Sequence, residues 1–280
     1  MAFDASLLVL RTDTPGSCAT DDPDDPDDDG CSHLSSAIAA GINQARISGA
    51  RVLNISLGGD SAGSQVRNAI ASATAAGTIV VVSAGNAGNA APDGFAAEVA
   101  ASGNGLVIIA GAVGETNGIS TFSNRAGTQA ANCLTALGER VRADDHEGTA
   151  FLWSGTSFSA PQISGAAALL AQAFPNLTGT QIVQLLLTSA RDAGVAGTDD
   201  VDGRRILDIA AAFQPRAGSS LAGTTIAVGP NAGGGQTSAA MGPATPQGPQ
   251  DGAVVLGGFE GAFASVWAPG CRRAAPWCWW

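Results

Sequence analysis

The sequence predicts an α/β fold built on a doubly wound, mostly parallel sheet. Continuous apolar runs lie within Thr78–Ser83 and Leu106–Ala110, and such runs are typical of strands that are covered on both faces. Stretches with apolar residues at helical spacing separate these runs, for example Val66–Ala76. Because strand and helix alternate, we expect parallel strands joined by right-handed crossovers. A hydrophobic content of 45% with 38 glycines suits such a core.

The first part of the chain is predicted to hold a strand, an acidic loop and a helix. Leu7–Leu10 is a short apolar run that we expect to form a buried strand. Asp13–Gly30 is rich in Pro and Asp, which is typical of a loop. A helix follows, with Ser32 or Ser35 as its cap and Gly49 at its end. Its buried face is expected to comprise Ile38, Ile42, Ala45 and Ile47.

The strand–helix alternation continues through the middle of the chain. Arg51–Ser56 is predicted to be a strand, and the pair Gly58 and Gly59 stops it. Val66–Ala76 is predicted to be a helix that ends at Gly77.

Composition argues against several classes of function. The net charge is −11, but seven aspartates lie within Asp21–Asp29, so the imbalance is mostly local. The sequence contains no basic cluster that would indicate a nucleic-acid partner. No apolar run in it is long enough for a membrane span. Met1–Ser6 lacks the basic and apolar regions of a signal peptide. The five cysteines are an odd number, and Cys18 and Cys31 flank the acidic stretch, where they could pair.

The segment Gly155–Pro161, with the sequence Gly-Thr-Ser-Phe-Ser-Ala-Pro, precedes an apolar stretch at helical spacing, Ile163–Phe174. We therefore expect Ser157 at the mouth of a helix, where free backbone N–H groups and the positive end of the helix dipole are found. A serine there can attack a carbonyl while its own N–H faces the oxygen that becomes negative. Alternatively, Gly-Thr-Ser is only a helix cap. The local pattern leaves both interpretations open.

Three segments, in the same order along the chain, resemble subtilisin-like serine peptidases. Gly155–Pro161 is similar to the nucleophile segment of that family, and Ser157 matches the nucleophile. Ser56–Gly59 and Ser83–Asn86 resemble two further family segments, and each follows a predicted strand. Ligands of doubly wound sheets bind beyond the carboxyl ends of the strands. The resemblance covers about residues 1–213 and implies the subtilisin-like form of the α/β fold.

The resemblance implies a serine-type endopeptidase that acts on polypeptides and requires no cofactor. Within it, Asn86 supplies a side-chain amide to the oxyanion hole, together with the backbone N–H of Ser157. Taken alone, Asn86 would be interpreted as a turn residue. The segments implied to line the substrate channel, including one wall of the pocket for the residue before the cut, contain Ser56, Leu57, Gly58, Gly59, Ser83, Ala84 and Gly85.

The aspartate and histidine segments of the family have no match in this sequence. Of the two histidines, His33 lacks the Gly-Thr that follows the catalytic histidine, and His146 lies in Asp144–Gly148, which is predicted to be a hairpin tip. Because a triad needs a base and an orienting carboxylate, we expect an N-terminally incomplete domain that is inactive alone. Met1–Ala5 resembles an internal segment of the family, which suggests an upstream continuation. Alternatively, the chain is a non-catalytic remnant or a binding module.

The acidic stretch offers carboxylates to a hard cation such as Ca²⁺, although a solvated surface loop is the favoured interpretation. Its candidate ligands are Asp21, Asp22, Asp24 and Asp25. No other set of metal ligands is predicted. The cysteine-flanked insertion resembles autotransporter-type bacterial members of the family, as do Ser123–Gly127 and Ser219–Gly223. That resemblance implies a full-length protein exported to the cell surface or beyond. A disulfide between Cys18 and Cys31 is expected from their positions on either side of the acidic stretch.

Three regions are predicted along the chain. The first is a partial peptidase domain, residues 1–213, closed by Gly203–Asp208, which resembles the final segment of the family domain. A linker rich in Gly, Pro and Ala covers 214–251. A partial module and a tail rich in Trp and Cys occupy 252–280, and we expect this extension to be poorly ordered.

Overall fold

The computed structural model describes most of the chain and divides it into two compact units. The described residues are 2, 4–20, 31–145, 147–192, 197–214, 220–221, 253–256 and 262–265. The units are Met1–Phe213 and Gln214–Trp280, and each is considered by itself.

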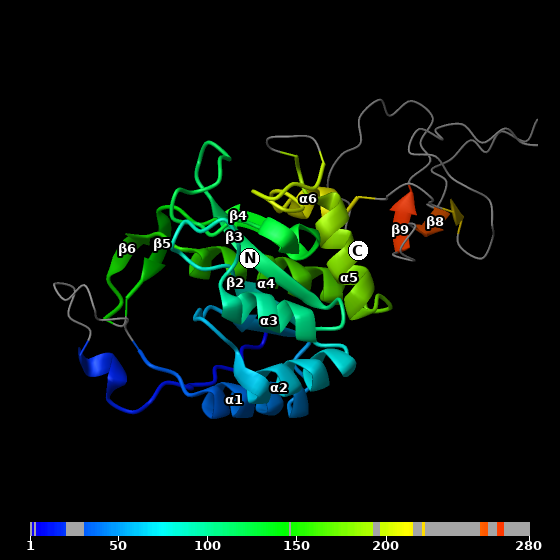
Figure 1. Cartoon of the computed structure of the whole chain (residues 1–280). Coiled ribbons are helices and arrows are strands. Elements are labelled where there is room, and N and C mark those ends of the chain that lie inside the picture. Colours follow the sequence, from blue (N-terminus) through cyan, green and yellow to red (C-terminus); the bar gives the residue numbers. More distant parts are fainter. Residues whose placement is uncertain are drawn as a thin grey trace, which may run out of the picture. The chain divides into compact units, whose positions relative to one another are not determined.

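A four-stranded parallel sheet in the order β1-β2-β3-β4 forms the centre of the first unit (Figure 1). Its strands are β1 Val52–Ile55, β2 Ile79–Ser83, β3 Val107–Val113 and β4 Cys133–Leu137. Ile55 is in register with Val82, and Ser83 with Ala110. The carboxyl ends of β1 and β2 therefore lie side by side, and the segments that follow them are brought together.

Helices cover both faces of this sheet. On one face lie α1 Ser35–Ile47, α2 Gly63–Ala75 and α3 Gly94–Ser102, and on the other lie α4 Thr156–Ala173 and α5 Gly179–Ser189 (Figure 1). The α4 helix contacts all four strands, and α5 packs on α4. The predicted α/β fold with a parallel sheet is confirmed.

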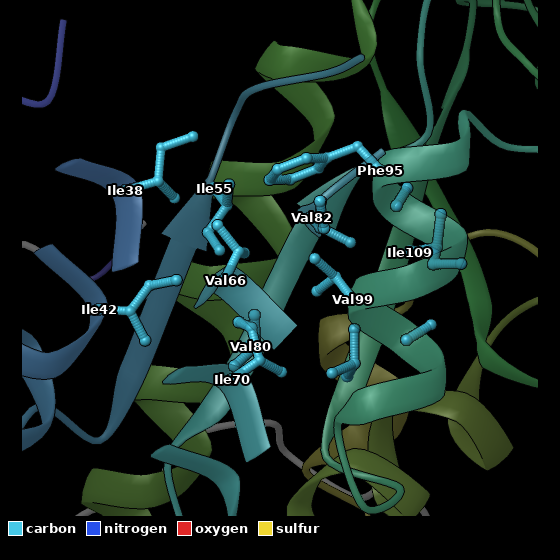
Figure 2. Packing of buried hydrophobic residues seen from close by; sticks show 14 of the residues in the cluster. Ile38, Ile42, Ile55, Val66, Ile70, Val80, Val82, Phe95, Val99 and Ile109 are labelled. Carbon is cyan, nitrogen blue, oxygen red and sulfur yellow. The ribbon is translucent and has the colours of Figure 1, made fainter. Parts of the chain in front are cut away.

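The core explains why the strand segments are continuously apolar. Side chains of α1, α2 and α3 pack on one face of the sheet, in a cluster that includes Ile38, Ile42, Ile55, Val66, Ile70, Val80, Val82, Phe95, Val99 and Ile109 (Figure 2). Because strand residues alternate between faces, Ile79 and Val81 point toward the α4 side. Val80, Val81 and Val82 are completely buried, so apolar side chains are favoured on both faces of β2 up to its last residue, Ser83.

The predicted strand at Leu7–Leu10 is wrong. This segment joins no strand among the described residues, and Leu7 and Val9 are 86% and 85% exposed. Leu10 instead lies against α1, where a Cβ added to Gly41 would be 3.9 Å from the Leu10 Cβ. An apolar run does not reveal whether a partner strand is available, and pairing decides whether the run becomes a strand.

The predicted helix after the acidic loop is confirmed as α1, but its expected buried face is partly wrong. Ile47 is 68% exposed, whereas Ala39 is buried beside Ile38. Since each residue turns the helix by about 100°, Ile47 lies about 200° round from the buried Ala45. No side-chain hydrogen bond caps this helix, so the expected cap at Ser32 or Ser35 is also wrong.

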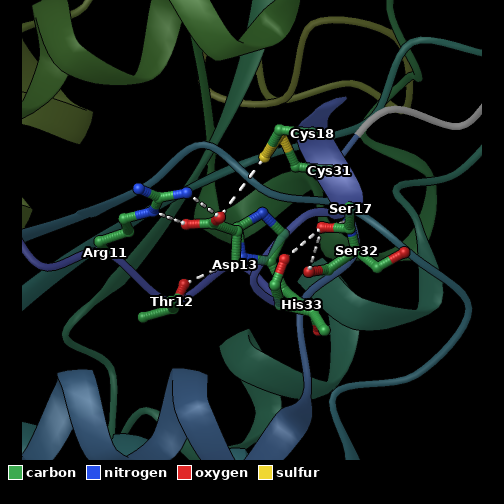
Figure 3. The surroundings of a disulfide bond; sticks show 9 residues. Arg11, Thr12, Asp13, Ser17, Cys18, Cys31, Ser32 and His33 are labelled. Atoms are coloured by element: carbon green, nitrogen blue, oxygen red, sulfur yellow. Dashed lines mark hydrogen bonds and ion pairs between the residues drawn. A yellow bond between two sulfur atoms is a disulfide. The ribbon is translucent and has the colours of Figure 1, made fainter. Parts of the chain in front are cut away.

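A disulfide joins Cys18 and Cys31, whose Cα atoms are 4.4 Å apart (Figure 3). Beside it, Arg11 donates to both carboxylate oxygens of Asp13, at 2.6 and 2.7 Å. This contact holds the pKa of Asp13 below its usual value. The calcium candidates Asp21, Asp22, Asp24 and Asp25 lie outside the described residues.

An antiparallel hairpin precedes α4, as predicted. Its strands are β5 Val141–Asp144 and β6 Ala150–Trp153. His146, which lies between these strands in the sequence, is outside the described residues. The remaining short elements of the first unit are η1 Ser17–Thr20, η2 Gly127–Asn132 and α6 Ile209–Ala212.

The second unit contains a three-stranded antiparallel sheet of β7 Ser220–Leu221, β8 Ala253–Leu256 and β9 Ala262–Ser265. Throughout the described ranges, no helix combines the length and apolar character that crossing a membrane requires.

The α5 helix begins with a capping box. Thr178 Oγ1 accepts from the backbone N–H of Gln181 at 3.2 Å, and the Thr178 N–H donates to Gln181 Oε1 at 2.8 Å. Because Thr178→Ala leaves an N-terminal amide without its acceptor, we expect the free energy of unfolding to fall by about 1 kcal/mol. Urea denaturation of the chain measures this loss. The conservative variant Thr178→Ser is expected to retain most of the stability, and equal losses in both variants would contradict a capping role.

Candidate active site

Ser157 is the second residue of α4, at the end of the helix predicted to present it. Gly155 precedes the helix and donates its N–H to the carbonyl of Gly138 at 2.8 Å, which holds the turn into α4. The first N–H groups of a helix have no intrahelical acceptor, so the amide of Ser157 belongs to a set of donors at this end. Ser157 is half-buried.

The orientation of the Asn86 side chain follows from its partners. Its Oδ1 lies 2.8 Å from the backbone N of Thr156 and 2.9 Å from Thr156 Oγ1. A backbone N–H can only donate, so the atom that faces it must be the amide oxygen. The Nδ2 end is therefore the free end of the amide. It lies beside Gly155, where an added Cβ would be 3.6 Å from Nδ2. The structure thus brings an amide donor to the end of α4 that carries Ser157.

Thr156 holds this arrangement together. It is completely buried. Its Oγ1 accepts from the N–H of Gly85 at 3.3 Å and donates to Asn86 Oδ1. One hydroxyl thus links the loop after β2 to α4. From the sequence alone Thr156 is only a possible helix cap, because its hydrogen-bond partners lie 70 and 71 residues away.

The Thr156 hydroxyl is expected to contribute measurably to stability. Thr156→Val keeps the backbone N–H and the shape of the side chain but removes the hydroxyl that accepts from the buried Gly85 amide. Leaving such an amide unpaired costs about 1–3 kcal/mol, and we expect chemical denaturation to show a loss of that size. Thr156→Ser, which keeps the hydroxyl, is expected to lose less. Equal stability of the valine variant and the native chain would contradict the network.

The segments that follow β1 and β2 are tied to each other and to α4. Ser56 Oγ donates to the carbonyl of Ser157 at 3.0 Å. Ser83 Oγ donates to the carbonyl of Leu57 at 3.0 Å. The structure therefore brings Ser56–Gly59 and Ser83–Gly85 together beside Ser157, although 101 residues separate Ser56 from Ser157.

Asp93 is a polar residue of this region that the sequence analysis missed. Its carboxylate accepts from Asn124 Nδ2 at 2.6 Å and from the backbone of Gly59. Burial raises the pKa of Asp93, and the two hydrogen bonds oppose that change. Pro92-Asp93-Gly94 has the composition of an ordinary turn, so no local signal distinguished it.

Asn124 braces the loop that carries Asn86. Its Oδ1 accepts from the backbone N–H groups of Ala87 and Asn89, at 3.2 and 2.8 Å, and its Nδ2 donates to the carbonyl of Ala84 at 3.1 Å. A buried side chain with every polar atom used keeps the loop in one conformation.

No side chain in the described part of the chain hydrogen-bonds the Ser157 hydroxyl. His33 interacts elsewhere, with Thr12 Oγ1, at 3.0 Å (Figure 3). The described residues also contain no cluster of three or more metal-ligating side chains.

Cys133 does not compete with Ser157 as a nucleophile. It is a free cysteine buried in β4. Burial raises the pKa of its thiol to about 12, so the reactive thiolate is scarce at neutral pH.

An aromatic cluster adjoins Ser157 on the hairpin side. The rings of Trp153 and Phe158 are stacked with centroids 6.1 Å apart, and Phe151 meets Trp153 edge-on at 5.9 Å. Phe151 and Trp153 remain 49% and 39% exposed. The region next to the serine therefore carries apolar surface that is open to solvent.

Comparison with known proteins identifies related sequences. The model of the Subtilase family matches residues 24–204. Subtilisin DY of Bacillus licheniformis is 33% identical over 162 residues, which cover 57% of this chain and 56% of that protein. Mycosin-1 of Mycobacterium tuberculosis is 32% identical over 253 residues, which cover 76% of this chain and 55% of that protein. The chain thus spans about half the length of the curated relatives it matches.

Solved structures show the same fold. The self-cleaved protease domain of PatA is 28% identical with a TM-score of 0.56, and the match covers 65% of this chain and 67% of that one. A protease from Pseudoalteromonas arctica is 30% identical with a TM-score of 0.52, covering 65% of this chain and 59% of that one.

Proposed function

The chain belongs to the subtilase family, and we propose that it contributes the nucleophile, the oxyanion hole and a substrate channel to a serine endopeptidase. The observation that carries the proposal is the geometry of Asn86, whose amide oxygen is held by Thr156 so that its N–H₂ group is left free beside Gly155. A donor fixed in this way can stabilise a developing oxyanion without moving during the reaction.

In the proposed reaction, Ser157 Oγ attacks the carbonyl carbon of a peptide bond while a general base takes its proton. The carbonyl oxygen becomes negative and accepts hydrogen bonds from Asn86 Nδ2 and from the Ser157 N–H. The C–N bond then breaks, the base returns the proton to the leaving amine, and water hydrolyses the ester on Ser157 by the same route. No cofactor takes part.

The substrate lies along the segments after β1 and β2 in this proposal. Ser56–Gly59 and Ser83–Gly85 are adjacent and are joined to α4 by hydroxyl hydrogen bonds. Their position beyond the carboxyl ends of parallel strands is where ligands of such sheets bind.

The base and its carboxylate are not assigned to any described residue. The 280 residues contain no match to the aspartate and histidine segments of the family, and the Ser157 hydroxyl has no base as partner in the described ranges. The proposal therefore treats the 280-residue chain as inactive alone. A second candidate, a non-catalytic relative that keeps the fold and the groove, is favoured by the same observation.

The proposal also places the protein outside the cytoplasm, with the autotransporter-type members of the family. The Cys18–Cys31 disulfide supports this location, because disulfides persist in oxidising compartments. Calcium binding by the acidic segment between these cysteines belongs to the proposal on the chemistry of its carboxylates alone.

Reaction with a fluorophosphonate probe tests the proposal. The probe is applied to the 280-residue chain and to a longer gene product that includes any upstream coding sequence, and the labelled site is mapped by mass spectrometry. We expect slow labelling of the short chain and rapid labelling at Ser157 of a longer product that supplies the base. Absence of labelling in both forms would favour the non-catalytic candidate, whereas rapid labelling of the short chain would contradict its inactivity.

A further inference from the structure

Asp93 lies between the two segments that flank Ser157. It directly precedes α3, and its backbone N–H donates to the carbonyl of Ala84 at 2.9 Å. Two residues later, the N–H of Phe95 donates to the carbonyl of Gly59 at 2.9 Å. The turn that carries Asp93 is therefore bonded to the segment after β2 and to the segment after β1.

The carboxylate occupies space that glycines leave open. A Cβ added to Gly58 would lie 2.7 Å from Asp93 Oδ2, and a Cβ added to Gly85 would overlap Asp93 Oδ1. Any side chain at these two positions would therefore displace the carboxylate. Both glycines belong to the segments that line the proposed substrate channel, so the Asp93 carboxylate lies between these two segments.

The Asp93 carboxylate lacks a cationic partner in the part of the chain that the structure describes. Within the described residues, none of the ion pairs involves Asp93. Its hydrogen-bond donors, Asn124 and the Gly59 backbone, are neutral. A neighbouring acid, Asp60, adds negative charge. Asp93 is half-buried rather than enclosed, and Gly58 and Gly59 beside it are exposed. A half-buried carboxylate with only neutral donors attracts a cation that brings its own hydrogen bonds.

We propose that Asp93 makes the part of the substrate channel between Gly58 and Gly85 specific for a basic side chain. This side chain, arginine or lysine, belongs to the substrate residue that precedes the cleaved bond. This inference rests on the proposed function, because that function places the acyl side of the substrate along Ser56–Gly59. A guanidinium or ammonium group that reaches the Asp93 carboxylate forms a charge-assisted hydrogen bond with it, whereas an uncharged side chain of similar length leaves the carboxylate without a counter-ion.

Binding of cleavage products tests this inference without requiring catalysis. Isothermal titration measures the affinity of the 280-residue chain for acetyl-Ala-Ala-Arg, acetyl-Ala-Ala-Lys and acetyl-Ala-Ala-norleucine, each with a free carboxylate. We expect the two basic peptides to bind roughly 10- to 100-fold more tightly than the norleucine peptide, the range for hydrogen bonds to charged groups. Equal affinities, or no measurable binding of the basic peptides, would overturn the inference.

Two substitutions of Asp93 and one control substitution locate the effect. Asp93→Asn is expected to abolish the preference for basic peptides, and Asp93→Ser is expected to do the same by a different substitution. Asp60→Asn removes the same charge nearby and is expected to retain most of the preference. Thermal unfolding confirms that each variant is folded. A preference that survives in a folded Asp93 variant would show that Asp93 only braces the loops.

The outcomes separate this inference from the proposed function. If a longer gene product hydrolyses peptides through Ser157 but shows no Asp93-dependent preference, only the specificity inference fails. If basic peptides bind in an Asp93-dependent manner and Ser157 never reacts, the site is a binding groove and the catalytic proposal fails.

Discussion

Replacing Ser157 by Ala is expected to lower kcat by about 10⁶-fold in any form of the protein that hydrolyses peptides. The substitution removes the atom that forms the acyl intermediate, so the whole covalent route is lost. The size of the expected loss is that measured on subtilisin, a member of the same family. Hydrolysis of a fluorogenic peptide, with active sites counted by fluorophosphonate titration, measures the change.

Ser164→Ala is the matched control for this substitution. Ser164 lies on the same helix, and its hydroxyl donates to Asn54 Oδ1 at 3.0 Å, at the edge strand β1. We expect this variant to retain its kcat and to show at most a small loss of stability. Comparable loss of activity in both serine variants would point to damage to α4 rather than to removal of a nucleophile.

Replacing Asn86 by Asp is expected to lower kcat by about 10²–10³-fold with little change in KM. Loss of one oxyanion donor has this effect in subtilisin, from which the magnitude is taken. The aspartate keeps an oxygen for the N–H and hydroxyl of Thr156, so the loop is expected to hold its position. The second oxygen replaces the N–H₂ group and repels the negative charge that forms in the transition state.

Asn89→Ala provides the comparison for Asn86. Asn89 is an exposed residue of the same loop, and its backbone N–H, which the substitution retains, donates to Asn124 Oδ1. We expect unchanged kcat and KM. If Asn86→Asp raised KM and left kcat intact, the residue would bind the substrate in its ground state, and its assignment to the oxyanion hole would be wrong.

Segments whose partners are close in sequence could be predicted well. The α4 helix begins where Gly155-Thr156-Ser157 indicates, and the segment after Thr178 forms the helix that its apolar spacing predicts. The strand β2 could be recognised because both of its faces are covered, so that its composition is apolar throughout. Two other core elements, α3 and β4, were not recognised. They are short, and β4 contains a threonine that the fold satisfies with the distant carbonyl of Arg205 at 3.1 Å.

The α/β class, the alternation of the recognised strands and helices and the three segments that carry the family resemblance follow from the sequence alone. These depend on periodicity and on short motifs, which are local properties of the chain. The hydrogen bond from Thr156 to Asn86 and the position of Asp93 between Gly58 and Gly85 could be found only in the folded structure. The same holds for Leu7–Leu10, which lies outside the sheet. The physical reason is that hydrogen bonds, buried charge and strand pairing depend on partners many residues away, and only the folded backbone brings these together.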